Sequence, residues 1–318
     1  MSVIEKQGIT TDFAKLPSGR GTFFDPDGSA HAIRSDAPIF YLIERGPADH
    51  TVDGALLKQA SELGVEIRFK SRLEAVEGSG IIASGPKAAD AIAVGYHFST
   101  EMDDGYWVIF DDELAPQGYA YLLVWNGRGT VKTCMFSGFK REKEYVDRTV
   151  EAFENLVGLE MRNPKEHGGF GNFNIPRSAR SGHHLLVGEN AGFQDTLWGF
   201  GMRFAISSGV LAAQSLLTGA DYDETWHREL KPQMQASVVN RCLFSLLGNR
   251  NYGRFARQTL ARPNPRAALR RHYGLSLFKR LLAPWARRRY RSRRKDESCD
   301  HIDCECIWCR HGKNSHPS

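Results

Sequence analysis

A glycine-rich turn between an apolar strand and a helix carries the clearest chemistry in this chain. Residues 185–187 form a short apolar run, typical of a buried strand, that ends at Gly188. Beyond Gly199 and Gly201, apolar residues recur at helical spacing over residues 202–213. A helix that begins near Gly201 presents free backbone N–H groups and a partial positive charge at its start. The turn therefore predicts a site for an anionic, electron-rich ligand.

Glycines beside carboxylates at this turn suit a flavin. A reduced flavin carries negative charge around N1 and the C2 carbonyl, and its ribityl hydroxyls need acceptors. Glycines allow the backbone to approach the ring closely, and Glu189 or Asp195 can supply the carboxylate. We expect Arg45 to lie nearby. The predicted flavin contacts within the run are Gly188, Glu189, Gly192, Asp195, Gly199, Gly201 and Met202.

This run resembles the second FAD-binding motif of the geranylgeranyl reductase family of FAD-dependent oxidoreductases, which is related to the aromatic-ring flavin monooxygenases. In that family the pattern is G-D-A-A-G, then G-x-G opening a helix, then S-G. Glu189 replaces the usual aspartate and lengthens the carboxylate arm by one methylene. From the residues alone, a strand, turn and helix of another α/β protein is the alternative. The pattern stands here as Gly188-Glu189-Asn190-Ala191-Gly192, Gly199-Phe200-Gly201 and Ser208-Gly209.

The resemblance covers about residues 35–220 and lacks the family's first motif. A family member should begin with a strand and a G-x-G-x-x-G loop that cradle the pyrophosphate of FAD. Here the first residues are polar and turn-rich, and the match resumes at Arg45 and Asp53 and then at residues 81–86, which resemble the family's returning strand. We therefore expect an FAD-binding domain that is incomplete at its N-terminus. A late gene start, a partner chain that supplies the segment, or weak FAD binding would each explain this.

Residues 90–139 change to a strand pattern. Aromatic and β-branched runs occupy 91–98, 105–110, 118–125 and 130–136, and Asn126-Gly127 is a strong hairpin signal. The family resemblance places the aromatic face of this antiparallel sheet over the flavin, and residues 116–121 look like its P-x-G-Y-x-W pocket segment. Tyr119 and Tyr121 are thus predicted pocket residues, with cross-strand packing as the alternative. The glycines of 167–171 predict a loop.

The fold class that follows is α/β, with an incomplete three-layer FAD/NAD(P)-binding fold, an antiparallel β-sheet substrate lobe and a C-terminal helical arm. Predicted helices include 51–63 with Thr51 as N-cap, 141–156, a long one over 225–247, and one starting at Asn264-Pro265, while 65–69 reads as a strand. We divide the chain into a partial FAD-binding domain (1–90), the substrate lobe (91–180), the returning strand-turn-helix (181–220), a basic helical arm (221–295) and a cysteine-rich tail (296–318).

Positive charge gathers in the arm. No Asp or Glu occurs between Leu230 and Lys295, a stretch that holds 18 Lys and Arg, so the rest of the chain is acidic. Residues 275–294 mix leucines and a tryptophan with arginines, which suits the surface of an anionic bilayer. A solvated arm and an arm packed on the acidic body are the alternatives. Nucleic acid is not expected as a partner, because no zinc-finger or helix-turn-helix framework accompanies the charge.

The tail concentrates four of the six cysteines in eleven positions. Tetrahedral zinc takes four such ligands, and the last two form a C-x-x-C loop. An iron–sulfur cluster, a redox dithiol and a disordered tail are the alternatives. The isolated Cys134 and Cys242 do not form a secreted disulfide framework, and no signal peptide or membrane-spanning run is evident, which favours the cytoplasm, with peripheral membrane contact. The predicted metal ligands are Cys299, Cys304, Cys306 and Cys309.

The family resemblance implies a flavin-dependent oxidoreductase that reduces carbon–carbon double bonds of an isoprenoid or prenyl lipid. Hydride would pass from flavin N5 to one carbon, with a proton from a pocket donor or water, and no residue stands out as that donor. A monooxygenase or halogenase that protects a flavin hydroperoxide is a second interpretation. A non-catalytic scaffold, whose basic arm and cysteines bind a partner, is the third.

Overall fold

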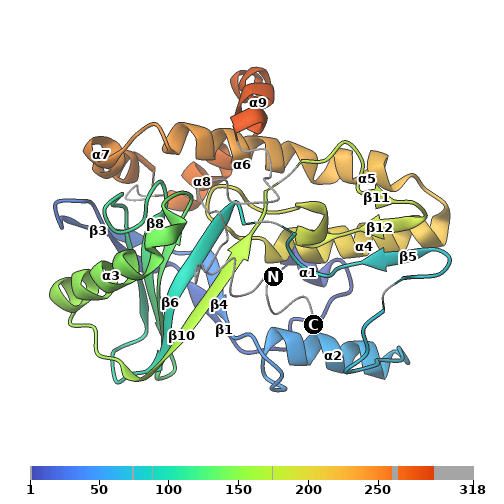
Figure 1. Ribbon diagram of the computed structural model, residues 1–318, viewed down its shortest axis with the longest axis horizontal. Coiled ribbons are helices and arrows are strands. Elements are labelled where there is room, and N and C mark those ends of the chain that lie inside the picture. Colours follow the sequence, from blue (N-terminus) through green and yellow to red (C-terminus); the bar gives the residue numbers. More distant parts are fainter. Residues whose placement is uncertain (1, 74, 88, 174, 260–263, 290–318) are drawn as a thin grey trace.

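The computed structural model describes the chain except residues 1, 74, 88, 174, 260–263 and 290–318. Within the described residues, a seven-stranded sheet and a three-stranded sheet stand side by side, and helices from the C-terminal third lie along the upper side of both (Figure 1). The predicted α/β class is confirmed.

The seven-stranded sheet has the order β10-β6-β9-β8-β7-β2-β3 and is antiparallel except where β2 meets β7. All four predicted strands are confirmed, and the turn between two of them has Asn126 and Gly127 at φ of 52° and 69°, the left-handed values that a two-residue hairpin needs. Two strands come from the N-terminal segment, which the sequence had not assigned to this sheet. The strands are β2 (Arg20–Phe24), β3 (Ala30–Arg34), β6 (Ala91–Ser99), β7 (Gly105–Ile109), β8 (Tyr119–Trp125), β9 (Arg128–Met135) and β10 (Arg162–Gly171).

The loop predicted for residues 167–171 is wrong, because these residues end strand β10. His167 pairs with Gly95 and Gly171 with Ala91, in register with β6. Glycines are weak strand formers, but backbone pairing with a long neighbouring strand overrides that preference.

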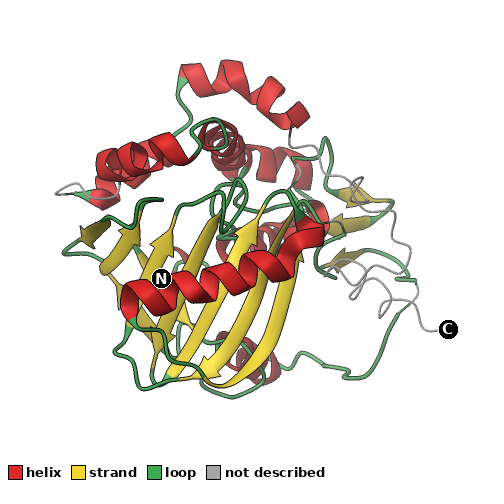
Figure 2. Ribbon diagram, turned by 60° about the vertical axis from the view of Figure 1, so that its left-hand side comes forward, coloured by secondary structure: helices red, strands yellow, loops and turns green. Residues whose placement is uncertain are grey.

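Helix α3 (Glu142–Val157) covers one face of the large sheet, as Figure 2 shows. Its Phe153 is fully buried against Leu122 and Val131, which confirms the predicted amphipathic helix. Because side chains alternate along a strand, Tyr119 and Tyr121 point to the opposite face. That second face is the one turned away from α3.

The smaller sheet contains the predicted strand before the glycine-rich turn. Its order is β11-β12-β5, with β11 (Arg180–Ser181) antiparallel and β5 (Gly80–Ile82) parallel to β12 (His184–Leu186). Among the described residues, β5 pairs on one side only. The strand predicted over 65–69 is wrong: these residues are exposed and irregular, because no described strand lies beside them.

The remaining N-terminal elements are a two-stranded sheet and two helices. Thr51 caps helix α2 by accepting a hydrogen bond from Gly54 N at 3.1 Å, as predicted. The elements are α1 (Ser2–Glu5), β1 (Lys15–Ser18), β4 (Phe40–Ile43) and α2 (Val52–Glu62), with β1 and β4 paired.

The helix predicted over 225–247 is two helices. The break falls at Leu230, just before Pro232. Proline has no backbone N–H and would break a continuous helix, but it is tolerated in the first turn of the second helix. Asn264 caps α8, as predicted. None of the described helices is both long and apolar enough to cross a bilayer. The helices are α4 (Met202–Thr218), α5 (Tyr222–Glu229), α6 (Lys231–Phe244), α7 (Asn249–Thr259), α8 (Pro265–Tyr273) and α9 (Leu277–Arg289).

Candidate functional site

The glycine-rich turn leads into α4 without a cap from any described side chain. Gly188, Gly192 and Gly199 have φ of 55°, 82° and 74°, values that favour glycine and let the chain reverse twice between β12 and α4. Gly201 is the N-cap, and no described side chain caps the helix. The first N–H groups of this 17-residue helix are therefore available for a ligand. Ser208 fixes the turn from within, because its hydroxyl accepts a hydrogen bond from Gly188 N at 2.9 Å.

Gln194 occupies the space beside Gly201. A Cβ added to Gly201 would overlap the amide group of Gln194. That amide donates to Glu189 Oε1 at 2.5 Å, and its oxygen accepts from Asp195 N at 2.9 Å. The glycine-rich motif did not predict that Gln194 would lie here. A ligand that approaches the start of α4 must therefore fit beside the hydrogen-bonded side chain of Gln194.

The two predicted carboxylates have different surroundings. Asp195 is buried and accepts hydrogen bonds from the Ser237 hydroxyl, from Tyr273 OH at 2.8 Å and from Leu197 N at 3.3 Å. It therefore ties the turn to α6 and α8. Burial and the Asp195 carboxylate together raise the pKa of Tyr273 well above its usual value, so its hydroxyl remains a donor.

Glu189 instead faces the large sheet. A Cβ added to Gly171, at the end of β10, would lie 3.0 Å from Glu189 Oε1. Burial raises the pKa of Glu189. Of the two predicted acceptors, the geometry favours Glu189 as the one available to a ligand.

Tyr119 joins the substrate lobe to the turn. Its hydroxyl donates to the backbone carbonyl of Trp198, and the two rings lie 5.4 Å apart in an edge-to-face arrangement. The Tyr121 ring is 5.9 Å from that of Tyr119. Cys134 lies opposite Tyr119 on β9, and burial raises the pKa of its thiol to about 11. The structure thus brings the predicted pocket tyrosines and the predicted flavin turn together, while the Met202 side chain is 43% exposed.

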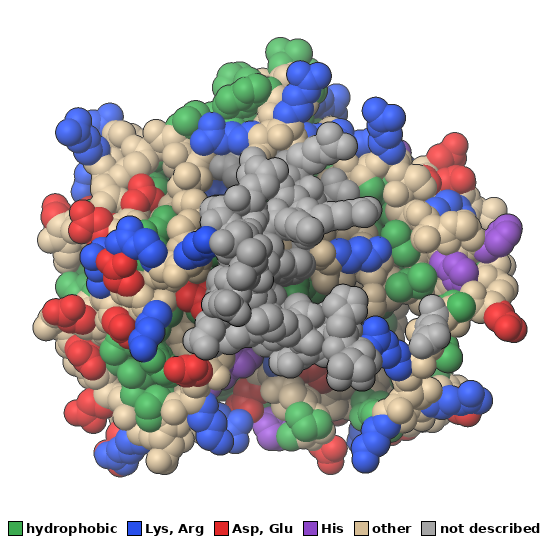
Figure 3. Space-filling view, viewed as in Figure 1, with side chains coloured by type: hydrophobic (Ala, Val, Ile, Leu, Met, Phe, Trp, Pro, Cys, Tyr) green, Lys and Arg blue, Asp and Glu red, His purple; other side chains and the backbone are tan. Residues whose placement is uncertain are grey.

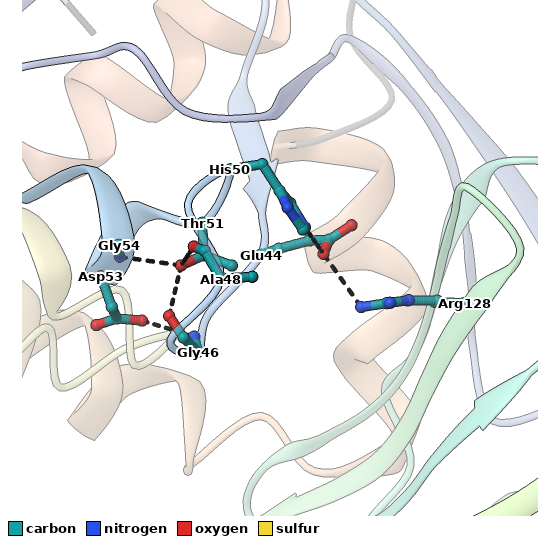
Figure 4. Close-up of polar contacts among 8 residues, drawn as sticks. All are labelled: Glu44, Gly46, Ala48, His50, Thr51, Asp53, Gly54 and Arg128. Atoms are coloured by element: carbon teal, nitrogen blue, oxygen red, sulfur yellow. Dashed lines mark hydrogen bonds and ion pairs between the residues drawn. The ribbon is translucent and has the colours of Figure 1, made fainter. Parts of the chain in front are cut away.

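Arg45 forms a bidentate pair with Asp53. Its Nε and Nη2 donate to the two carboxylate oxygens at 2.7 and 2.9 Å, which raises the pKa of Arg45. Asp53 also accepts from Gly46 N at 2.9 Å, within the turn drawn in Figure 4. The two residues that matched the family pattern therefore hold each other at the start of α2.

Glu44 links this turn to the large sheet. Its Oε2 lies 3.0 Å from His50 Nε2 and 3.2 Å from Nη1 of Arg128 on β9, as Figure 4 shows. The contact fixes the β4–α2 connection against the end of the β8–β9 hairpin.

The predicted zinc ligands Cys299, Cys304, Cys306 and Cys309 lie outside the described residues. Over the part of the chain that is described, no group of three or more His, Cys, Asp or Glu side chains could hold a metal ion.

Comparisons with known proteins give distant likenesses. No protein-family profile matches the chain. A digeranylgeranylglycerophospholipid reductase of Haloferax volcanii is 22% identical over 264 residues, which are 67% of this chain and 64% of the reductase. The chain thus spans less than two thirds of the length of the curated relative that it matches.

Two solved structures share the fold. A geranylgeranyl bacteriochlorophyll reductase-like protein of Thermoplasma acidophilum has a TM-score of 0.65 at 15% identity, covering 91% of this chain and 86% of that one. A flavin-dependent brominase has a TM-score of 0.63 at 12% identity, with the same coverage. The chain therefore has the fold of these two proteins, and its order of strand, glycine-rich turn and helix is similar to that of geranylgeranyl reductase-like proteins.

Proposed function

We propose that this protein is a flavin-dependent reductase of carbon–carbon double bonds in an isoprenoid or prenyl lipid. One observation carries the proposal: the uncapped start of α4, reached through three left-handed glycines, lies beside a sheet face that bears Tyr119 and Tyr121. The name of the Haloferax relative supports the substrate class.

The residues present fit the flavin end of the cofactor. The free N–H groups at the start of α4 would face the negative N1 and C2 carbonyl region, and Glu189 would accept from the ribityl hydroxyls. When bound and reduced, the cofactor supplies the hydride. Tyr119 holds the sheet against the turn. Burial raises the pKa of Tyr119 well above its usual value, so the hydroxyl keeps its proton.

Activity is tested with reduced flavin, under anaerobic conditions, on a geranylgeranyl glycerophospholipid. We expect mass spectrometry to show the gain of two hydrogens per reduced double bond. In a parallel reaction with oxygen present, an oxygenated product would assign the protein to the monooxygenases instead. Purified protein that takes up no flavin on titration would leave only the scaffold interpretation.

The ADP half of FAD requires a further segment, which we propose is added beside β5, in this chain or from a partner. The described part of the sheet ends at β5, whose Ile81 is 38% exposed, and Val65 and Phe69, in the segment between α2 and β5, are 55% and 72% exposed. Unpaired strand edges and exposed apolar side chains of this kind favour the addition of another strand.

We therefore expect this chain alone to bind FMN and FAD with dissociation constants within about threefold, a difference under 1 kcal/mol. Fluorescence quenching of each flavin on titration measures the constants, with riboflavin as a reference for the ring and ribityl chain alone. FAD that bound about 100-fold more tightly than FMN would show that this chain already holds the ADP half.

We also propose that α9 rests on an anionic lipid surface. Leu277, Phe278, Leu281 and Trp285 are 78%, 58%, 81% and 49% exposed, at spacings that place them along one side of the helix. The opposite side packs on α6 through Ala283 and Ala286. Figure 3 shows hydrophobic and basic side chains together at the top of the molecule, where Figure 1 places α9. The neighbouring cations include Arg280, Arg288 and Arg289.

Sedimentation with vesicles tests this surface. Burying one leucine contributes about 1.5–3 kcal/mol, so Leu281→Glu should weaken pelleting with phosphatidylglycerol vesicles by about tenfold or more. Leu217→Glu is the matched control, because Leu217 is 86% exposed on α4. Pelleting should be weak with neutral vesicles and fall with added salt. Equal pelleting of both variants would contradict the proposal. So would finding that the wild-type protein is a dimer without lipid and that Leu281→Glu makes it monomeric, because α9 would then bind a second copy of the chain.

A further inference from the structure

A buried lysine lies in the middle of the sheet face that α3 leaves uncovered. Lys132 is 7% exposed on β9. In the strand register it stands opposite Tyr121 on β8 and Gly95 on β6, and Gly95 in turn stands opposite His167 on β10. Residues directly opposite one another project to the same face of a sheet. These four positions therefore form one row across four strands.

The Lys132 side chain reaches across this row to His167. Its Nζ lies 2.5 Å from His167 Nδ1, two strands away. The side chain can cross β6 because Gly95 between them has none, and a Cβ at that position would overlap the Val131 carbonyl. His167 is exposed, and its ring lies 4.2 Å from that of His97. A buried amine is thereby connected to solvent through one imidazole.

Lysine is almost never buried unless it is paired, so a buried lysine at this position indicates a functional role. The titratable groups that face it are Tyr121 on β8, Cys134 on β9, His97 on β6 and His167 on β10. Burial lowers the pKa of Lys132 to about 8, and burial raises the pKa of Tyr121 above its usual value. Burial, together with Lys132 and His167, lowers the pKa of His97 to about 4. Lys132 can therefore lose and regain a proton close to neutral pH while Tyr121 and His97 stay uncharged.

The row lies on the same face as the contacts with the flavin turn. Two residues further along β9, Cys134 stands opposite Tyr119, which bonds to Trp198 in the turn. Along β10, Gly171, which adjoins Glu189, lies four positions beyond His167. At about 3.3 Å per residue, this distance is about 13 Å. Along β9, Lys132 is only two residues, about 7 Å, from Cys134, so a double bond held on this face between the turn and Lys132 can be reached from both sides.

We propose that Lys132 donates the proton that completes double-bond reduction, and that His167 passes a proton from solvent to restore it. This inference rests on the proposed function. When bound and reduced, the cofactor would supply the hydride that forms a C–H bond at one alkene carbon, a two-electron transfer to the substrate. The other carbon takes the proton from the Lys132 ammonium as the π bond is lost, and the neutral amine regains a proton from water through His167.

The first test needs neither cofactor nor substrate. The ¹⁵Nζ and ¹³Cε signals of Lys132, assigned by their disappearance in Lys132→Met, are followed by NMR as pH is raised. We expect titration near pH 8, more than two units below the value of about 10.4 for a free lysine side chain. Titration at the value of free lysine would overturn the proposal.

The second test follows the reaction in D₂O. Lys132→Met should slow reduction by about 100-fold or more, the usual contribution of a positioned acid, and Lys132→Arg should not restore it. In the wild type, the positioned donor should deliver deuterium to one face of the alkene only. In Lys132→Met, solvent should supply the deuterium and both faces should receive it. The wild-type rate should fall above pH 8, because the donor is active only while protonated. Lys165→Met is the matched control, since Lys165 is exposed on the same strand as His167.

The two proposals fail in different ways. A Lys132→Met variant that keeps wild-type rate and stereochemistry, with flavin bound, would overturn the role of Lys132 and leave the proposed reduction standing. A wild-type protein that binds flavin but reduces no alkene would overturn the proposed reduction, and the proton donor with it.

Discussion

Replacing Gly201 with valine is expected to weaken flavin binding by about 10- to 100-fold, because overpacking a filled site costs about 1–3 kcal/mol. The new side chain would overlap the Gln194 amide and break its hydrogen bonds to Glu189 and Asp195 N. It would also stand over the N–H groups at the start of α4. Flavin fluorescence on titration measures the change.

Two further variants separate this effect from a general loss of folding. Gly209→Ala lies on the same helix, where an added Cβ meets nothing within 4 Å, so it should leave flavin affinity unchanged. Gly201→Ala should weaken binding less in a Gln194→Ala background than alone, because the obstacle has been removed. Unchanged affinity in Gly201→Val would show that flavin does not approach this turn.

Replacing Asp195 with alanine is expected to lower the free energy of unfolding by about 3 kcal/mol or more, the cost of leaving several buried donors unsatisfied. The Ser237 and Tyr273 hydroxyls and Leu197 N all lose their acceptor at once. Asp195→Asn should cost less, because one carbonyl oxygen remains. Urea unfolding measures both variants.

The control for this variant is Asp36→Ala, which removes an exposed carboxylate elsewhere in the chain. It should unfold at the wild-type urea concentration. If Asp195→Ala also did so, Asp195 would not be the anchor of the turn, and its assignment as a flavin contact would need to be considered again.

Local signals in the sequence predicted much of this structure. Thr51 and Asn264 cap their helices, and Asn126-Gly127 makes the hairpin, because in each case neighbouring atoms alone satisfy the backbone. The glycine-rich turn before α4 was predicted for the same reason: only a few φ values allow such a turn, and glycine adopts them readily. Its role in flavin binding stays a prediction.

Features that depend on distant partners were missed. Residues 65–69 have the composition of a strand but no described neighbour, whereas the glycines of β10 form a strand because β6 lies beside them. The roles of Gln194 and Lys132 depend on Gly201 and His167, which become their neighbours only after folding. No periodicity within one segment encodes such contacts.

The burial of Cys134 also bears on resistance to oxidative damage. Peroxide attacks the thiolate form of cysteine, and a reduced flavin in air is a source of peroxide. With a pKa of about 11 and an exposed fraction of only 9%, this thiol presents almost no thiolate at neutral pH. Cys242 is also buried, and its pKa is raised by burial. The interior sulfur atoms of both residues should therefore survive repeated turnover in air unmodified.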